Sequence, residues 1–189
     1  MSDIRIAYSD EMSPTALQAS NYRLDGQSLP QGTSLYFSDQ NKDEVVIELP
    51  IGSINKSDTF VLTVSEKIVS SDGERLDRNE LIQIVDGLID NVKPVIKSAE
   101  KVNSTTILIN FSEDLSVFDL TDFIVKVNDT EIDIFSYDFV DDDAVSLYVS
   151  NYNAVQTVTV ESVEDPEDTM DEAGNILVGD YKVIAKSAD

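Results

Sequence analysis

The chain has 189 residues, with 37 Asp and Glu against 13 Lys and Arg and a formal net charge of −24. This charge repels nucleic-acid phosphates and anionic lipid headgroups, so we expect neither nucleic-acid binding nor membrane insertion. The chain has no His and no Cys, which excludes Ser-His and Cys-His catalytic pairs, disulfides and thiolate metal sites. Hydrophobic residues make up 41% of the chain, which argues for folded domains rather than acidic disorder.

Short runs rich in Val, Ile, Thr, Tyr and Phe, with alternating polarity, predict β-strands along the whole chain. The strands predicted in the first half are 3–8, 21–25, 33–38, 44–49, 59–65 and 80–86. Those predicted in the second half are 95–100, 105–111, 122–128, 131–139, 144–149, 155–163 and 180–186. Short strands at this spacing are typical of Ig-like sandwiches, so the predicted fold class is all-β, with Ig-like (fibronectin III-like) β-sandwich domains in tandem.

One segment carries two patterns. Apolar residues between Leu81 and Ile89 follow the spacing of an amphipathic helix, for which Asp77 could be the cap. The same stretch aligns with the predicted strand at 181–185 in the second half of the chain. We therefore favour a strand that ends near Asp86.

The two halves of the chain repeat each other. Residues 4–12 (IRIAYSDEM) are similar to residues 107–115 (ILINFSEDL), and further matches follow in the same order. The copies lie roughly a hundred residues apart, which exceeds the periods of solenoid repeats and allows each copy to bury its own core. The sequence therefore predicts two domains, 1–90 and 91–189, that meet at a short linker with apolar residues.

The second copy has a predicted strand at 94–99 that has no counterpart before Ile4. We therefore expect the first domain to lack its first strand and to expose an open sheet edge that invites pairing. We also expect the chain to be a piece of a longer protein, whose neighbouring domains would be its partners.

Acidic residues gather in three segments of the second copy: 113–114, 141–143 and 161–172. In a seven-strand sandwich these loops share the pole at which the chain enters, next to the linker. Ca²⁺ binds six to eight oxygen ligands, so one hypothesis is a structural Ca²⁺ site that stiffens the domain junction. The alternative is a solvated acidic pole, since no EF-hand spacing is present. The candidate metal ligands are Asp90, Asn91, Glu113, Asp114, Asp141, Asp143, Asp165, Asp168 and Asp171.

Several motifs resemble bacterial Ig-like repeats. Residues 102–115 (VNSTTILINFSEDL) resemble their D-S-T-T-V-x-V-x-F-S-E-x-V opening, and residues 171–177 (DEAGNIL) resemble their D-x-A-G-N-x-L element. Residues 8–14 (YSDEMSP) and 21–26 (NYRLDG) resemble the F-S-E-x-M-x-P and N-Y-x-L-D-G version, although residues 71–75 (SDGER) depart from Ala-Gly-Asn. Such repeats occur in S-layer proteins of Gram-positive bacteria and in other large surface proteins. The resemblance implies Ig-like sandwiches in an extracellular array, often sensitive to Ca²⁺.

These observations predict a non-catalytic structural segment of a bacterial surface-layer or cell-wall-associated protein, acting outside the cell as a spacer or lattice contact. Self-assembly into a lattice is one form of this role. No enzyme is expected, because catalytic motifs and Gly-rich phosphate loops are absent from the sequence. The alternatives are an adhesion or glycan-binding module, with Tyr36, Tyr148 and Tyr152 as a candidate stacking surface, or an accessory domain of a secreted hydrolase.

Overall fold

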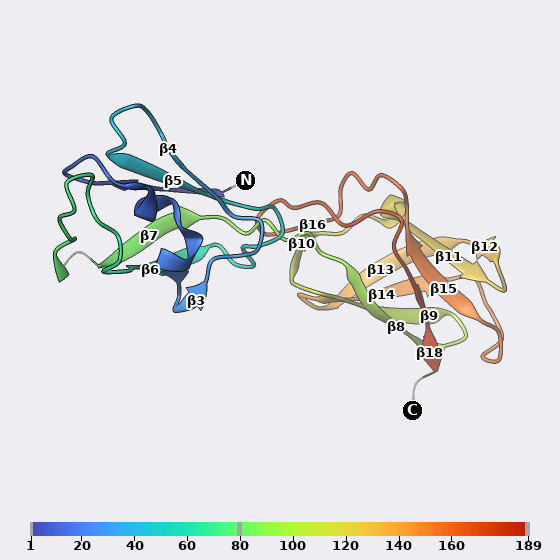
Figure 1. Cartoon of the computed structure of the whole chain (residues 1–189). Coiled ribbons are helices and arrows are strands. Elements are labelled where there is room, and N and C mark those ends of the chain that lie inside the picture. Colours follow the sequence, from blue (N-terminus) through green and yellow to red (C-terminus); the bar gives the residue numbers. More distant parts are fainter. Residues whose placement is uncertain (1, 79–80, 188–189) are drawn as a thin grey trace. The chain divides into compact units, whose positions relative to one another are not determined.

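The computed structural model describes residues 2–78 and 81–187 and divides into two units, Met1–Val92 and Lys93–Asp189 (Figure 1). Both units consist of short strands, and the described residues contain no α-helix. The all-β fold class expected from the sequence is confirmed. The helical turns that the structure describes are the 3-10 segments η1 (Pro14–Leu17), η2 (Ala19–Asn21) and η4 (Leu120–Asp122).

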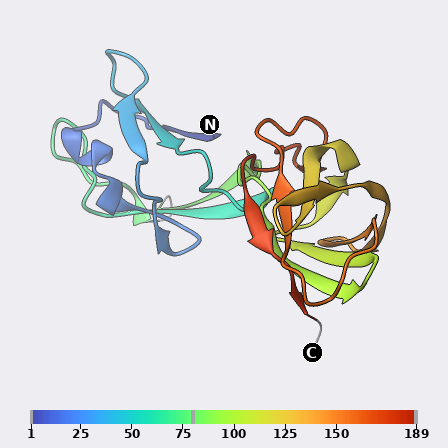
Figure 2. The same cartoon turned by 90° about the vertical axis from the view of Figure 1, so that its right-hand side faces the viewer.

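Unit 2 is a sandwich of two main sheets, visible in Figure 1 and from another side in Figure 2. The first sheet has the order β13-β14-β9-β8-β18, the second has the order β12-β11-β15-β17, and β10 pairs with β16 in a small ribbon. The strands of the first sheet are β8 (Ile96–Asn103), β9 (Thr106–Phe111), β13 (Ile134–Asp141), β14 (Ala144–Val149) and β18 (Lys186–Ser187). The others are β10 (Leu115–Val117), β11 (Phe123–Val127), β12 (Thr130–Ile132), β15 (Val158–Ser162), β16 (Met170–Asp171) and β17 (Lys182–Ile184).

This strand order is that of a constant-type Ig sandwich, in which strands A, B, E and D face strands C, F and G. Strand β8 takes the place of A, β9 of B, β14 of E and β13 of D. In the facing sheet, β11 takes the place of C, β15 of F and β17 of G, and β12 adds a C′ strand. The core lies between the sheets, where alternate residues of β9, β14 and β15 point inward. The inward-facing residues of these three strands include Ile107, Ile109, Phe111, Leu147, Val149, Val158 and Val160, all of them buried.

Unit 1 repeats this arrangement, but its described residues form no counterpart of β8, of β18 or of the β10–β16 ribbon. Its sheets have the orders β1-β5-β4 and β3-β2-β6-β7, which correspond to B-E-D and C′-C-F-G. The strands are β1 (Ser2–Ala7), β2 (Tyr22–Leu24), β3 (Gln27–Ser28), β4 (Ser34–Phe37), β5 (Glu44–Leu49), β6 (Asp58–Val64) and β7 (Ile82–Leu88). Strand β1 pairs with β5, and among the residues that the structure describes no strand pairs with its other edge.

A shared hydrogen bond shows that β1 and β9 are equivalent. The Tyr8 N–H donates to the Asp43 carbonyl at 2.7 Å, and the Phe111 N–H donates to the Asp143 carbonyl at 2.8 Å. Both bonds lie just beyond a strand pair in which B runs antiparallel to E. The sequence repeat of residues 4–12 and 107–115 is therefore a repeat of the same strand and the same turn contact.

The ambiguous segment is a strand, β7, although residue 80, where the predicted strand began, lies outside the described residues. The strand ends at Leu88 rather than near Asp86, because pairing with β6 continues past Gly87 to Asp58 through an irregular register. Ile82 and Ile84 are 64% and 70% exposed. These outward apolar residues on an edge strand produced the helix-like spacing.

The short strands β3, β10 and β16 were not predicted from the sequence, and two of the predicted strands each correspond to two strands in the structure. The predicted strand 131–139 is split between β12 and β13, which belong to different sheets. The predicted strand 180–186 is likewise split, because β17 pairs with β15 in one sheet and β18 pairs in parallel with β8 in the other. Ala185, 4% exposed, marks the crossing point between the sheets.

Candidate metal site and its supporting loops

The three acidic segments of unit 2 lie at one end of that sandwich and are joined by hydrogen bonds. The Leu115 N–H, just after Glu113 and Asp114, donates to the carbonyl of Asp142 at 2.9 Å. The Ser116 hydroxyl donates to the Asp171 carbonyl at 2.5 Å, and β10 pairs with β16 beside it. Loops that follow different strands of both sheets therefore form one acidic surface.

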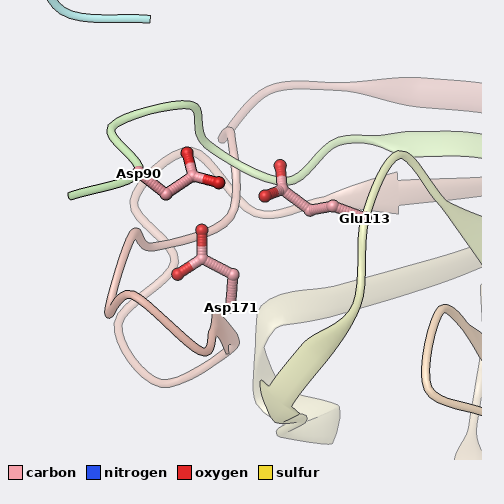
Figure 3. A group of neighbouring side chains, drawn as sticks. All are labelled: Asp90, Glu113 and Asp171. Atoms are coloured by element: carbon pink, nitrogen blue, oxygen red, sulfur yellow. The ribbon is translucent and has the colours of Figure 1, made fainter. Parts of the chain in front are cut away.

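Three of the candidate ligands form a close group. Asp90, Glu113 and Asp171 each offer a carboxylate oxygen, and these atoms all lie within 4.8 Å of one another. Figure 3 shows the three carboxylates turned toward one another. Asp90 lies on the segment that leads into β8, Glu113 follows β9, and Asp171 ends β16. Like charges this close repel, so a cation among them would lower the free energy of the group.

The Asp171 carboxylate is held in place by its own loop. Its two oxygens accept hydrogen bonds from the Asn175 backbone N–H at 2.8 Å and from the Asn175 side-chain amide at 2.7 Å. The Gly174 N–H donates to the Asp171 carbonyl at 3.3 Å, and Gly174 has φ +83°, a conformation that glycine adopts without strain. The D-x-A-G-N motif is thus a closed turn that presents a 3% exposed carboxylate. Each oxygen keeps a further lone pair for a ligand.

Asn91 has another role in the structure. Its side-chain oxygen accepts hydrogen bonds from the N–H groups of Ser53 and Ile54, each at 3.0 Å, and its amide donates to the Pro50 carbonyl at 3.3 Å. Both lone pairs of that oxygen are therefore engaged. Asn91 fastens the 50–54 loop of unit 1.

The remaining candidates lie outside the group of three carboxylates that the described residues form. Asp141 is exposed and accepts a hydrogen bond from the Asp142 N–H at 3.0 Å, which stabilises the turn between β13 and β14. Asp114, Asp165 and Asp168 are exposed, and Asp143 is partly buried. These carboxylates add negative charge around the group.

Sequence reasoning missed the most constrained carboxylate of this region. Asp122 is 3% exposed, and its oxygens accept hydrogen bonds from three consecutive N–H groups: Glu167 at 3.0 Å, Asp168 at 3.2 Å and Thr169 at 2.6 Å. Asp122 therefore holds the acidic loop that leads to Asp171. The sequence feature that could have identified Asp122 is its match with Asn21, which occupies the same place before the C strand of unit 1 and is 4% exposed.

The donor set of the group suits a hard cation. Carboxylate oxygens are the ligands that Ca²⁺ and Mg²⁺ prefer, whereas Zn²⁺ sites in proteins draw mainly on Cys and His. Ca²⁺ needs six to eight oxygens, so backbone carbonyls and water would have to complete the shell. The three carboxylates fit the first ligands of such a site.

The proposed aromatic stacking surface is wrong for Tyr152. That side chain is 5% exposed and belongs to the core of unit 2, with its hydroxyl donating to the Thr106 carbonyl at 3.4 Å. Tyr36 and Tyr148 are 42% and 36% exposed, but they belong to different units. The Tyr148 hydroxyl is bonded to Asp138 at 3.0 Å.

No protein-family model and no curated protein matches the chain. Among solved structures, the N-terminal part of the bacterial S-layer protein SbsC is similar, with 15% identity and a TM-score of 0.40. The match covers 50% of this chain and 24% of that one. A likeness of this size is too slight to carry an argument about function. Within the described residues, no helix has the length and apolar character needed to cross a membrane.

Proposed function

We propose that the chain is a non-catalytic structural segment of a bacterial surface-layer or cell-wall-associated protein. In this role it lies outside the cell and serves as a spacer or lattice contact. The observation that carries the proposal is the repeated strand order, since both units build B-E-D and C′-C-F-G sheets. Repetition of one module suits spacing and contact, which need many similar surfaces rather than one reactive centre.

The motifs that resemble bacterial surface repeats support this proposal. The F-S-E type of motif lies at the B strand in both units, since residues 102–115 include β9 and residues 8–14 directly follow β1. The N-Y-x-L-D-G match, residues 21–26, includes the C strand β2 of unit 1. The D-x-A-G-N element forms the closed turn at Asp171. The motifs are therefore structural parts of the module, as expected of a repeat selected for its shape.

Electron microscopy of the full-length parent protein, with and without Ca²⁺, tests the structural role. We expect the parent to assemble into sheets with a regular repeat, and antibodies against this chain to label the surface of intact cells. A parent that stays monomeric under all cation conditions would contradict a lattice role. Saturable binding of the chain to a wall polysaccharide would favour the adhesion alternative instead.

We further propose that Ca²⁺ binds at Asp90, Glu113 and Asp171, a prediction that rests on the oxygen donors and on their mutual distances below 4.8 Å. A ligand that binds only the native state stabilises it by about 2.7 kcal/mol at a hundredfold excess over Kd. For a unit of this size, that is a rise in Tm of roughly 10–20 °C. Thermal unfolding with Ca²⁺ and then with a chelator measures this shift.

A matched pair of variants separates a site from a general acidic surface. Glu113→Gln removes a carboxylate of the group, and Asp114→Asn removes the neighbouring, exposed carboxylate with the same change in net charge. We expect Glu113→Gln to lose most of the Ca²⁺ shift and Asp114→Asn to keep it. Equal responses of both variants would mean a solvated acidic pole. Solution scattering of the same samples tests whether Ca²⁺ stiffens the tandem.

A further inference from the structure

The D strand is longer in unit 2 than in unit 1. Strand β13 has eight residues, whereas its counterpart β4 has four. One edge of β13 pairs with β14, and within residues 2–78 and 81–187 no strand pairs with the other edge. The chain before and after β13 is described and forms the rest of unit 2. This edge therefore belongs to the interior of the sequence, and it offers backbone donors and acceptors to a further strand.

Three apolar side chains of this edge strand are exposed: Phe135 by 65%, Phe139 by 45% and Val140 by 62%. Pairing with β14 is irregular at two places, around Phe135 and around Val140. Both residues therefore lie at bulges, which redirect side chains. The Phe139 ring lies edge-on to Phe118 and Tyr137, with centroid distances of 6.3 and 6.0 Å. The strand thus presents a group of apolar side chains to solvent, which is typical of an interaction site.

Residues 136–139 form a regular run between the two bulges. In this run, alternate residues direct their N–H and C=O groups away from β14. Because bulges interrupt strand pairing, a further strand has only this short run for its backbone hydrogen bonds. Side-chain contacts must then supply the rest of its affinity.

The segment around β13 is strongly acidic. No Lys or Arg occurs between residues 127 and 181. Among the described residues, no salt bridge involves an Asp of the segment 131–143. The acidic residues of that segment are Glu131, Asp133, Asp138, Asp141, Asp142 and Asp143.

The bases of unit 2 lie elsewhere. Lys126 is opposite Glu131 in the strand pair β11–β12, but its ammonium donates a hydrogen bond to the Glu161 carboxylate at 2.6 Å. The others lie in or near β8, β17 and β18, at the opposite edges of the two sheets from β13 and β12: Lys93, Lys97, Lys101, Lys182 and Lys186. The described bases of unit 2 therefore leave the acids along β13 uncompensated.

These charges decide what kind of strand the edge can accept. Two β13 strands placed edge to edge would bring Asp138 and Asp141 of one copy against the same acids of the other. Like charges on neighbouring strands are destabilising, whereas opposite charges there are favourable. The charge along β13 therefore disfavours a second copy and favours a segment that carries Lys or Arg.

A small pocket lies at the start of β13. Its volume is about 250 Å³, and its lining includes the apolar residues Leu120, Ile132 and Ile134 and the acidic residues Glu131 and Asp133. The aliphatic stem of a Lys or Arg can lie along apolar walls while its charged head reaches a carboxylate. The pocket therefore fits a basic side chain of a strand that lies beside β13.

We propose that the free edge of β13 binds a basic polypeptide segment in extended conformation. The segment pairs with residues 136–139 and places a Lys or Arg side chain in the pocket beside Glu131 and Asp133. This is recognition by strand addition, in which backbone hydrogen bonds give affinity and side-chain pockets give specificity. The inference rests on the edge of unit 2 and not on the proposed surface role, so either can fail without the other.

The test uses the full chain and a fluorescent nine-residue peptide in which Lys alternates with Val and Thr (KVKTKVKTK). We expect saturable binding by fluorescence anisotropy and slower hydrogen exchange at alternate amides of residues 136–139. The control is the same peptide with N-methyl groups on its three central amides, which keeps every charge and side chain but removes backbone donors. It should bind at least tenfold more weakly. Equal binding of the two peptides would mean general attraction to an acidic chain and would overturn the proposal.

Two variants of the chain with the same change in net charge test the location. Asp133→Lys alters the pocket, and Glu164→Lys alters an exposed acid of another loop of unit 2. Asp133→Lys should weaken binding about three- to tenfold and Glu164→Lys less than about twofold, because screening limits the reach of an exposed charge. Equal losses in both variants, or no saturation at millimolar peptide, would overturn the proposal. Dimerisation of the chain alone, with the same amides protected, would make a second copy the occupant and would also overturn it.

Discussion

Removal of the Asp122 carboxylate should destabilise unit 2 far more than removal of any neighbouring acid. In Asp122→Ala, the N–H groups of Glu167, Asp168 and Thr169 lose their shared acceptor. Hydrogen bonds to a charged group contribute about 1.5–3 kcal/mol each when their loss leaves a buried donor unpaired. Thr169 is 0% exposed, so its N–H has no access to water as a substitute.

The other two N–H groups belong to exposed residues, Glu167 and Asp168, which water can reach after the change. Their bonds should contribute the smaller net value of about 0.5–1 kcal/mol each. We therefore expect Asp122→Ala to lower the free energy of unfolding of unit 2 by about 3 kcal/mol. With a urea dependence of about 1.5 kcal/mol per molar, the midpoint would fall by about 2 M.

Amide hydrogen exchange in the full chain is the suitable assay, because two units need not unfold in one transition and exchange reports each separately. Glu167→Ala is the matched control, since it removes an exposed carboxylate from the same loop and should change stability by less than about 0.5 kcal/mol. If Asp122→Ala and Glu167→Ala have equal free energies of unfolding, the assigned role of the buried carboxylate is refuted.

Three further predictions follow from individual contacts. Gly179→Ala should lower the free energy of unfolding by about 3 kcal/mol, because the new Cβ would overlap a backbone carbonyl of the same loop. Gly174→Ala should lower it by only about 1 kcal/mol, because the new Cβ meets open space and only the φ of +83° is unfavourable. Thermal unfolding of both variants measures the difference. Burial raises the pKa of the Tyr22 hydroxyl in the folded chain. The stability that the neutral hydroxyl contributes is therefore complete below a pH of about 10 and declines as the pH rises above that value. Absorbance titration of the chain with and without Tyr22→Phe would show the raised pKa. The hydrogen bond that the Lys126 ammonium donates to the Glu161 carboxylate raises the pKa of Lys126. Glu161→Gln should return that pKa toward its ordinary value in an NMR titration, and an unchanged pKa would contradict this assignment.

The central strands could be predicted because their sequence pattern and their environment agree. Ile107, Ile109 and Phe111 recur at every second position and all point into one core, which is the arrangement that period-two patterning encodes. The edge strand β7 does not follow this pattern, since its apolar residues Ile82 and Ile84 are exposed. Two-residue strands such as β16 carry too few side chains for any period, and their pairing depends on loops brought together by the rest of the fold.

At the acidic end of unit 2, the sequence predicted which loops lie together but not which three of the nine candidate ligands form the close group. Strand lettering was enough to gather Glu113 and Asp171 at one end of the sandwich, because it decides where each loop lies. Hydrogen bonds within the loops, such as those from Asn175 to Asp171, decide which carboxylate turns inward. The amino-acid composition of a loop does not predict these bonds. A polar residue that recurs at the same place in both units predicts a structural role better than a cluster of charges does. Asn21 and Asp122 differ in charge, yet both precede a C strand, both are buried, and both bond to backbone groups of their own unit.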